Sequence, residues 1–170
     1  QFDGVFRYSK VSNLIDDTDT SILSNITTLK LRKSFTPTLA SATKYTISYN
    51  NAFYNPHSDH NKTAGGIVSS TGFKIDGNDN EMFLDDDGSG NIRLYYVSSG
   101  ARAYSTSTQG TIDYSTGEIV LNSLNVASIS NIRGSASTLI EVTVQPNSND
   151  IAPVRNQVLN IDTANSSITI

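Results

Sequence analysis

The stretch GTIDYSTGEIVLN, residues 110–122, decides the fold class. Two short runs within it, residues 110–114 and 118–122, alternate apolar and polar side chains, as strands do when one face is buried. The three-residue Ser-Thr-Gly connection places Gly117 where a left-handed backbone is needed, and glycine adopts that backbone without steric penalty. The stretch therefore predicts a β-hairpin.

Similar runs lie on both sides of this hairpin, separated by turn sequences such as DGND and DDDGSG. Further strands are predicted at residues 28–35, 44–49, 67–70, 73–76, 82–85, 91–98, 101–104, 139–145, 157–162 and 167–170. Arg32 is expected on an exposed strand face. Apolar residues at three- and four-residue spacing predict a short helix over residues 6–15.

These elements predict a mainly β fold, α+β with one or two short helices, built from antiparallel short-stranded sheets in a sandwich-like arrangement. A proline at position 146 ends the run 139–145. We therefore expect a main β domain over residues 1–146, including the helix. Residues 147–170 are expected to form a C-terminal turn and strand arm packed on the same core.

Composition narrows the function. The chain has 170 residues, no cysteine and a net charge of −4, which rules out disulfides and thiolate metal sites. No basic patch suggests nucleic acid, and no apolar run approaches the roughly 20 residues that cross a membrane. We predict no cofactor, nucleic-acid partner or membrane partner. Because the sequence begins at Gln1 rather than methionine, we expect a fragment of a longer protein.

The acidic stretch DDDGSGNI, residues 85–92, resembles a calcium loop with Asp85, Asp87 and Asn91 as candidate ligands. The glutamate that closes such a loop would fall at Tyr96, which cannot chelate calcium. The flanking segments are also predicted strands rather than helices. A polar hairpin turn is the favoured interpretation, and a weak ion site is the alternative.

Other polar clusters give little support for catalysis. His57, Asp59 and His60 share one loop, but the chain offers no third histidine or cysteine for a metal site. Asp113 and Glu118 flank the hairpin turn, where two carboxylates more often serve solubility than glycoside hydrolysis. We predict that the protein is not an enzyme.

Tyrosines and arginines mark a candidate subunit interface. Tyr95, Tyr96 and Tyr104 fall on adjacent predicted strands with Arg93 and Arg102. Tyrosine and arginine are enriched at the centres of protein interfaces. Packing across the strands of a sheet face is the alternative interpretation.

A second candidate interface lies near the C-terminus, in NDIAPVRNQVLNID, residues 149–162. Pro153 makes its surroundings extended and rigid. Arg155 and Asn156 follow among apolar residues, where a guanidinium needs a hydrogen-bonded partner. Arg155 is either a structural clamp or a subunit contact.

Several segments, in this order, resemble the C-terminal part of the baseplate wedge protein that forms the inner inter-wedge ring of T-even-type contractile-tailed phages (baseplate J-like). They are VSNLIDDTDTSILSNITTLKLRK (11–33), SSTGFKIDG (69–77), FLDDDGSGNIRLYYV (83–97), GTIDYSTGEIVLN (110–122) and VQPNSNDIAPVRNQVLNID (144–162).

The resemblance implies a structural virion protein of the tail baseplate, assembled in the host cytoplasm. In that family, copies associate with one another and with other wedge proteins and the sheath-initiating protein to link wedges around the tail tube. It thus implies a homodimer, within a ring in the full-length protein. A calcium-dependent adhesin-like or receptor-binding β domain is the alternative.

Overall fold

The computed structural model describes residues 5–60, 65–153 and 160–167. The chain divides into two compact units. Unit 1 combines Gln1–Thr27 with Asn149–Ile170, and unit 2 is Thr28–Ser148. In the described ranges every strand belongs to unit 2 and the one α-helix to unit 1. The predicted mainly β fold with antiparallel sheets and a short helix is confirmed. The expected arm at residues 147–170 stays a prediction.

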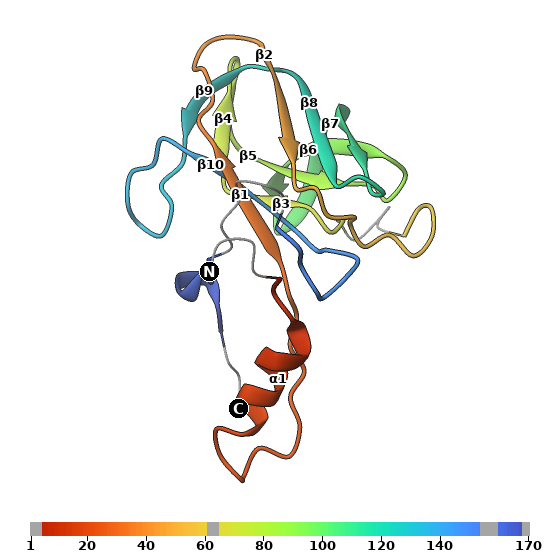
Figure 1. Ribbon diagram of the computed structural model, residues 1–170. Coiled ribbons are helices and arrows are strands. Elements are labelled where there is room, and N and C mark those ends of the chain that lie inside the picture. Colours follow the sequence, from red (N-terminus) through yellow and green to blue (C-terminus); the bar gives the residue numbers. More distant parts are fainter. Residues whose placement is uncertain (1–4, 61–64, 154–159, 168–170) are drawn as a thin grey trace. The chain divides into compact units, whose positions relative to one another are not determined.

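The larger sheet of unit 2 has seven strands in the order β2-β8-β7-β6-β5-β4-β9 and curls around the core (Figure 1). The strands are β2 (Thr43–Ser48), β4 (Phe73–Ile75), β5 (Asn78–Asp86), β6 (Asn91–Ser98), β7 (Ala101–Asp113), β8 (Glu118–Leu124) and β9 (Val126–Ile129). From β4 to β8, neighbours in the chain are also neighbours in the sheet. This part is therefore a meander of antiparallel hairpins. Strands β2 and β9 are the two edge strands of the whole sheet.

The smaller sheet has three antiparallel strands in the order β1-β10-β3. They are β1 (Leu31–Phe35), β3 (Ser69–Ser70) and β10 (Ile140–Val144). The central strand β10 pairs with β1 over its whole length, from Leu31 opposite Val144 to Phe35 opposite Ile140. This pairing joins segments more than a hundred residues apart in sequence.

Both sheets contribute side chains to one hydrophobic core. On β10, Ile140, Val142 and Val144 are fully buried, as the alternation in residues 139–145 predicts. The larger sheet adds fully buried side chains such as Phe73 and Leu121. Each such side chain stabilises the fold by about 1.5–3 kcal/mol relative to an exposed position. The core of unit 2 is thus large enough to stabilise it without disulfides.

The hairpin that decided the fold class is present between β7 and β8. Its connection is four residues long, Tyr114–Gly117, because Asp113 pairs directly with Glu118. The predicted three-residue connection is wrong by one residue. Gly117 adopts the predicted left-handed backbone with φ +71°. A Cβ at Gly117 would lie 1.9 Å from the carbonyl oxygen of Asn51, so only glycine fits there.

Three other differences from the sequence prediction concern strands. The runs at 101–104 and 110–114 belong to one continuous strand, β7, because its Ser- and Thr-rich middle continues the extended backbone. Strand β9 was missed, because only Val126 of its four residues is buried and no alternation is visible. Residues 154–159 and 168–170 lie outside the described residues, and the described parts of the runs 157–162 and 167–170 are not strands.

Arg32 on β1 does not lie on a fully exposed face. Its Nη1 donates to Oε2 of Glu141 on the neighbouring strand β10 at 2.7 Å, and its side chain is 24% exposed. Glu141 also accepts from Nη2 of Arg133 at 3.1 Å. The expectation failed because cross-strand pairing places a carboxylate beside the guanidinium.

Unit 1 contains helix α1, Tyr8–Asp16, close to the predicted range 6–15. None of the residues of α1 is buried. Phe6, just before the helix, forms an antiparallel bridge with Ile151, and both backbone hydrogen bonds of the bridge are present at 2.8 and 3.0 Å. In the part of the chain that the structure describes, no helix has the length and apolar character needed to cross a membrane.

A polar clasp holds residues 25–27 against α1. The Nδ2 atom of Asn25 donates to the carbonyl oxygen of Ser12 at 3.2 Å and to Oδ1 of Asp16 at 2.6 Å. The hydroxyl of Tyr8 donates to the carbonyl oxygen of Thr27 at 3.0 Å. Hydrogen bonds, rather than apolar packing, thus position this segment.

Candidate interaction surface

The outer face of the β5–β6–β7 meander carries a row of aromatic rings. Phe83, Tyr95 and Tyr104 lie directly opposite one another on the three strands. Their ring centroids are 5.6 Å apart for Phe83–Tyr95 and 5.9 Å apart for Tyr95–Tyr104. The neighbouring residues Met82 and Leu84 point to the core and are buried. Strand alternation therefore places this aromatic row on the face away from the core.

One carboxylate anchors this face. Asp85 is fully buried, and its carboxylate accepts hydrogen bonds from Nε and Nη2 of Arg93 at 2.8 and 3.1 Å. It also accepts from Nη1 of Arg102 and from the hydroxyl of Tyr104, the latter at 2.9 Å. Two guanidinium groups thus share one carboxylate, which leaves this cluster with a net positive charge.

The two guanidinium groups also stack on the aromatic row. The Cζ atom of Arg93 lies 4.4 Å from the ring centroid of Tyr104, and that of Arg102 lies 4.5 Å from the ring centroid of Tyr95. Such cation–π contacts contribute roughly 0.5–2 kcal/mol, depending on burial. Together with Asp85, they hold both arginines in one geometry.

Titration of Tyr104 and Arg102 reflects this arrangement. Burial raises the pKa of Tyr104, and its hydrogen bond to Asp85 raises it further because an ionised phenol would face a carboxylate. For Arg102, partial burial works to lower the pKa, but the hydrogen bond to Asp85, the charge of Asp85 and the interactions with Tyr95 and Tyr104 together outweigh it and raise the pKa overall. The phenol stays neutral and the guanidinium stays charged.

The same face is open to solvent at its β6–β7 end. Tyr104 is 40% exposed, Val97 is 57% exposed, and the side chain of Arg102 is 39% exposed. Pre-ordered tyrosine and arginine side chains are well suited to contact a partner, since little side-chain entropy is lost on binding. We call the set Tyr95, Val97, Arg102 and Tyr104 the Tyr/Arg surface.

A second buried carboxylate, Asp86, points to the opposite side of the sheet. It accepts from the backbone N–H of Val68 at 2.9 Å and from the hydroxyl of Tyr114 at 2.7 Å. Burial and the neighbouring carboxylate raise the pKa of Tyr114, so the phenol remains a donor. A Cβ at Gly66 would collide with the Asp86 side chain, so glycine is required for this close approach. Asp86 ties the long loop to the sheet.

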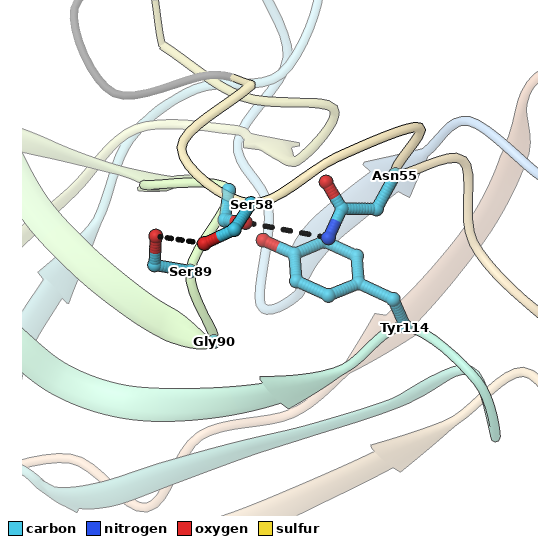
Figure 2. A pocket seen from close by; sticks show the side chains of 6 residues that line it. Asn55, Ser58, Ser89, Gly90 and Tyr114 are labelled. Carbon is cyan, nitrogen blue, oxygen red and sulfur yellow. Dashed lines mark hydrogen bonds between the residues drawn. The ribbon is translucent and has the colours of Figure 1, made fainter.

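A small polar hollow lies beside Tyr114 (Figure 2). It has a volume of about 220 Å³ and is lined by Asn55, Ser58, Gly88, Ser89, Gly90 and Tyr114. The Nδ2 atom of Asn55 donates to the carbonyl oxygen of Gly88 at 3.3 Å, and the hydroxyls of Ser58 and Ser89 lie 3.3 Å apart. The hollow is smaller than the roughly 300–1,000 Å³ of most small-molecule sites.

The candidate calcium ligands do not converge. The Oδ1 atom of Asp87 accepts from the backbone N–H groups of Ser89 and Asn91 at 2.8 and 3.0 Å, and its Oδ2 accepts from Nδ2 of Asn91 at 2.7 Å. Partial burial works to raise the pKa of Asp87, but these hydrogen bonds lower it overall. The Asp85 carboxylate instead faces Arg93. The turn is therefore closed by its own hydrogen bonds.

The two histidines contact each other in an exposed loop. Nδ1 of His60 lies 3.2 Å from Nε2 of His57. The carboxylate of Asp59, between them in sequence, accepts from the hydroxyl of Ser89 instead. Across residues 5–60, 65–153 and 160–167, no group of three or more histidines, cysteines and carboxylates is arranged to hold a metal ion.

The other interface candidates from the sequence are not part of the Tyr/Arg surface. Tyr96 lies on the opposite face of β6, where it packs against the hydrophobic core. Pro153 belongs to unit 1 and is half-buried. Arg155 and Asn156 lie outside the described residues. Of the tyrosines and arginines singled out in the sequence, the structure brings together Tyr95 and Tyr104 with the two arginines.

Sequence reasoning missed the pairing of Asp85 with Arg93. The signal was present: counting outward from the DGSG turn places position 85 opposite position 93 in the β5–β6 hairpin. Opposite charges at facing positions stabilise a sheet. The acidic run directed attention to metal binding instead, because Asp85 was grouped with its sequence neighbours rather than with its strand partner.

One comparison with known families finds a match at the N-terminal end of the chain. Residues 1–34 match the family model for baseplate structural protein gp6, C-terminal domain III. No curated protein and no solved structure matches the chain. The matched range covers α1, the clasped segment and most of β1, whereas the other segments that resemble the phage wedge family lie outside it. The match supports a structural role in a phage baseplate.

Proposed function

We propose that this chain is a module of a phage baseplate wedge or ring protein that associates with itself to link wedges around the tail tube. The match of residues 1–34 to a baseplate structural domain carries the proposal. A protein in such an assembly must offer specific surfaces to its neighbours, and closed homo-oligomers most often use two-fold contacts. The form expected for this chain is a homodimer.

The Tyr/Arg surface supports self-association. Side chains that are ordered before binding lose less entropy on association. Each long side chain that must first be immobilised costs about 0.5–1.5 kcal/mol of binding free energy. Arg102 is already held by Asp85 and by the ring of Tyr95. Tyr104 is already held by Asp85 and by Arg93.

In the assembled tail, the partners of this module are a second copy of itself, other baseplate wedge proteins and the sheath-initiating protein. Assembly takes place in the host cytoplasm, and the final location is the virion baseplate. Pro153, Arg155 and Asn156 remain candidates for a further contact. The protein uses no cofactor in this role.

The adhesin-like alternative has less support. It requires calcium at Asp85, Asp87 and Asn91, yet the Asp85 carboxylate is neutralised by two arginines and Asp87 caps its own turn. A calcium ion there would have to displace these hydrogen bonds. The structural role in a baseplate is therefore the better proposal.

Sedimentation velocity over a wide concentration range tests the proposal. We expect a monomer–dimer equilibrium that is the same with calcium and with a chelator. A monomer at every concentration would contradict self-association. A monomer whose melting temperature rises only with calcium would favour the adhesin-like alternative.

A further inference from the structure

The β6–β7 hairpin leaves one edge of β7 open. Strand β7 pairs with β8 only from Gly110 to Asp113, whereas between Ala101 and Thr106 it pairs only with β6. In the described part of the chain, no other strand lies along the outer edge of this stretch. Arg102 and Tyr104 within it are exposed. The hairpin therefore presents an unpaired strand edge beside the Tyr/Arg surface.

The turn at the tip fixes which backbone groups face outward. Ser99 and Gly100 connect the strands with φ of 51° and 80°, the positive values of a two-residue type I′ turn. In such a hairpin, the closing pair and every second pair after it are hydrogen-bonded. Ala101 and Ala103 thus bond to β6. The N–H and C=O groups of Arg102 and Tyr104 point outward.

This edge lacks lysine and proline, which often protect an exposed strand from pairing. Natural sheets place lysine, proline or inward-pointing charges at their edges to prevent pairing with other chains. Residues 101–106 contain no lysine or proline. The one charged side chain, Arg102, is turned onto Asp85 and Tyr95 on the sheet face. The register shifts between Leu94 and Tyr95, so Ser105 forms a β-bulge in β7. The flat part of the edge is therefore limited to the first residues of β7.

We propose that this edge pairs with the same edge of a second copy, antiparallel, about a two-fold axis at Ala103. The inference rests on the proposed self-association and names the surface that carries it. The outward groups of Arg102 and Tyr104 would then bond to those of the partner's Tyr104 and Arg102. Two sheets would join into one across the axis, which is a common form of β-augmentation.

Side-chain pairing favours this register, and because the register is self-complementary, it favours a second copy as the occupant. A two-fold axis at Arg102 would place two guanidinium groups directly opposite each other, which is unfavourable. An axis at Ala103 places each Arg102 opposite the partner's Tyr104. The stacking of arginine on tyrosine already present within one chain then continues across the interface, and two small alanine side chains meet at the centre.

A single cysteine tests the register, because the natural chain has none. In the proposed register, the two Ala103 residues form a non-hydrogen-bonded pair with Cα atoms about 4.5 Å apart. That separation falls within the range for a disulfide. Under mild oxidation, Ala103→Cys is expected to give a covalent dimer in high yield. Thr46→Cys, at an exposed position of the edge strand β2 of the same sheet, is expected to stay largely monomeric.

A charged side chain at the proposed two-fold axis tests the same contact without a covalent cross-link. Ala103→Lys places two ammonium groups side by side and is expected to raise the dimer dissociation constant at least about tenfold, or ~1.4 kcal/mol. Thr46→Lys is the matched control and should leave dimerisation unchanged. Circular dichroism spectra and melting temperatures show whether each variant folds. If Ala103→Lys does not fold, the cysteine pair decides alone.

The outcomes separate this inference from the proposed function. A wild-type dimer that Ala103→Lys weakens and Ala103→Cys traps supports both. If the wild type forms a dimer, but Ala103→Lys leaves its dissociation constant unchanged and Ala103→Cys gives no covalent dimer, the β7 edge is not the contact. Self-association then still stands. A wild-type monomer without cross-linking overturns both. Pairing of this edge only with a different baseplate protein would likewise overturn the second copy as its occupant.

Discussion

Units 1 and 2 are stabilised in different ways. Of the buried hydrophobic side chains in the described residues, only Ile151 belongs to unit 1, and all others belong to unit 2. Unit 1 also carries five of the nine exposed large hydrophobic side chains, among them Leu23 at 95% and Ile26 at 97% exposure. Unit 2 has an extensive core, whereas unit 1 depends on the polar clasp around Asn25 and the bridge between Phe6 and Ile151.

The difference shows where substitutions should act. In unit 2, a change to a buried side chain acts on the cooperative fold of the two sheets. In unit 1, a nine-residue helix without buried side chains has little stability of its own, because isolated helices of this length are marginal in water. Unit 1 substitutions should therefore alter local order and leave the global unfolding transition of unit 2 in place.

The largest loss is expected from Asp85→Ala in unit 2. This change leaves the buried Arg93 guanidinium without its carboxylate, and breaking a buried ion pair in this way costs about 3–5 kcal/mol. Urea denaturation measures the free energy of unfolding. Asp79→Ala, at an exposed position of the same strand, should change it by less than about 0.5 kcal/mol. Equal losses from both variants would contradict the role of Asp85 as an anchor.

The same chemical change in both units gives the most direct comparison. Leu121 on β8 is fully buried, so Leu121→Ala should cost about 2–5 kcal/mol through lost burial and the cavity left behind. Leu14 on α1 is 69% exposed, so Leu14→Ala should cost less than about 0.5 kcal/mol. Denaturant unfolding of both variants checks this. A comparable loss from Leu14→Ala would show that unit 1 belongs to the cooperative core.

Removal of the clasp should have a smaller and local effect. Asn25→Ala removes the side-chain hydrogen bonds to Ser12 and Asp16 of the helix, each with a net contribution of about 1 kcal/mol. Amide hydrogen exchange should speed up in α1 and residues 22–27, while protection of β8 and β10 stays unchanged. Asn13→Ala, on the exposed side of the same helix, is the control. Loss of protection across both units would refute the separation.

The smallest effect concerns acid stability of the β7–β8 turn. Hydrogen bonds from Ser115 and Thr116 lower the pKa of Asp113 to about 2. Because the folded-state pKa lies below the unfolded value of about 3.9, the ionised form stabilises the fold above pH 4, and this contribution is lost as the pH falls towards 2. Asp113→Asn should lower the melting temperature slightly at pH 7 and have less effect near pH 2. A difference from wild type that is independent of pH would contradict this linkage.

Much of unit 2 could be predicted because its strands alternate with buried side chains. Residues 91–98 were predicted as a strand with the observed bounds of β6, and the apolar face of residues 139–145 is the buried face of β10. Strand β9 could not be predicted, since a short edge strand buries too few side chains to produce alternation. Pairing with β4, rather than local sequence, makes it a strand.

The candidate surface was predicted in part. Tyr95, Arg102 and Tyr104 were grouped correctly, because adjacent strands of one hairpin bring them together. Tyr96 was grouped with them, although its neighbouring position in the strand turns it to the core. The Asp85–Arg93 pair depends on register between strands, which becomes visible only when the hairpin is aligned residue by residue.

The pairing of β1 with β10 also constrains how the chain folds during synthesis. Leu31 is paired with Val144, so the smaller sheet cannot form until nearly all of unit 2 has left the ribosome. The β4–β8 meander has only local connections and can form earlier, since pairing between sequence neighbours closes short loops. Until β10 arrives, the apolar side chains that will face it stay uncovered. We therefore expect nascent chains to be most prone to aggregation in the interval between completion of β8 and docking of β10.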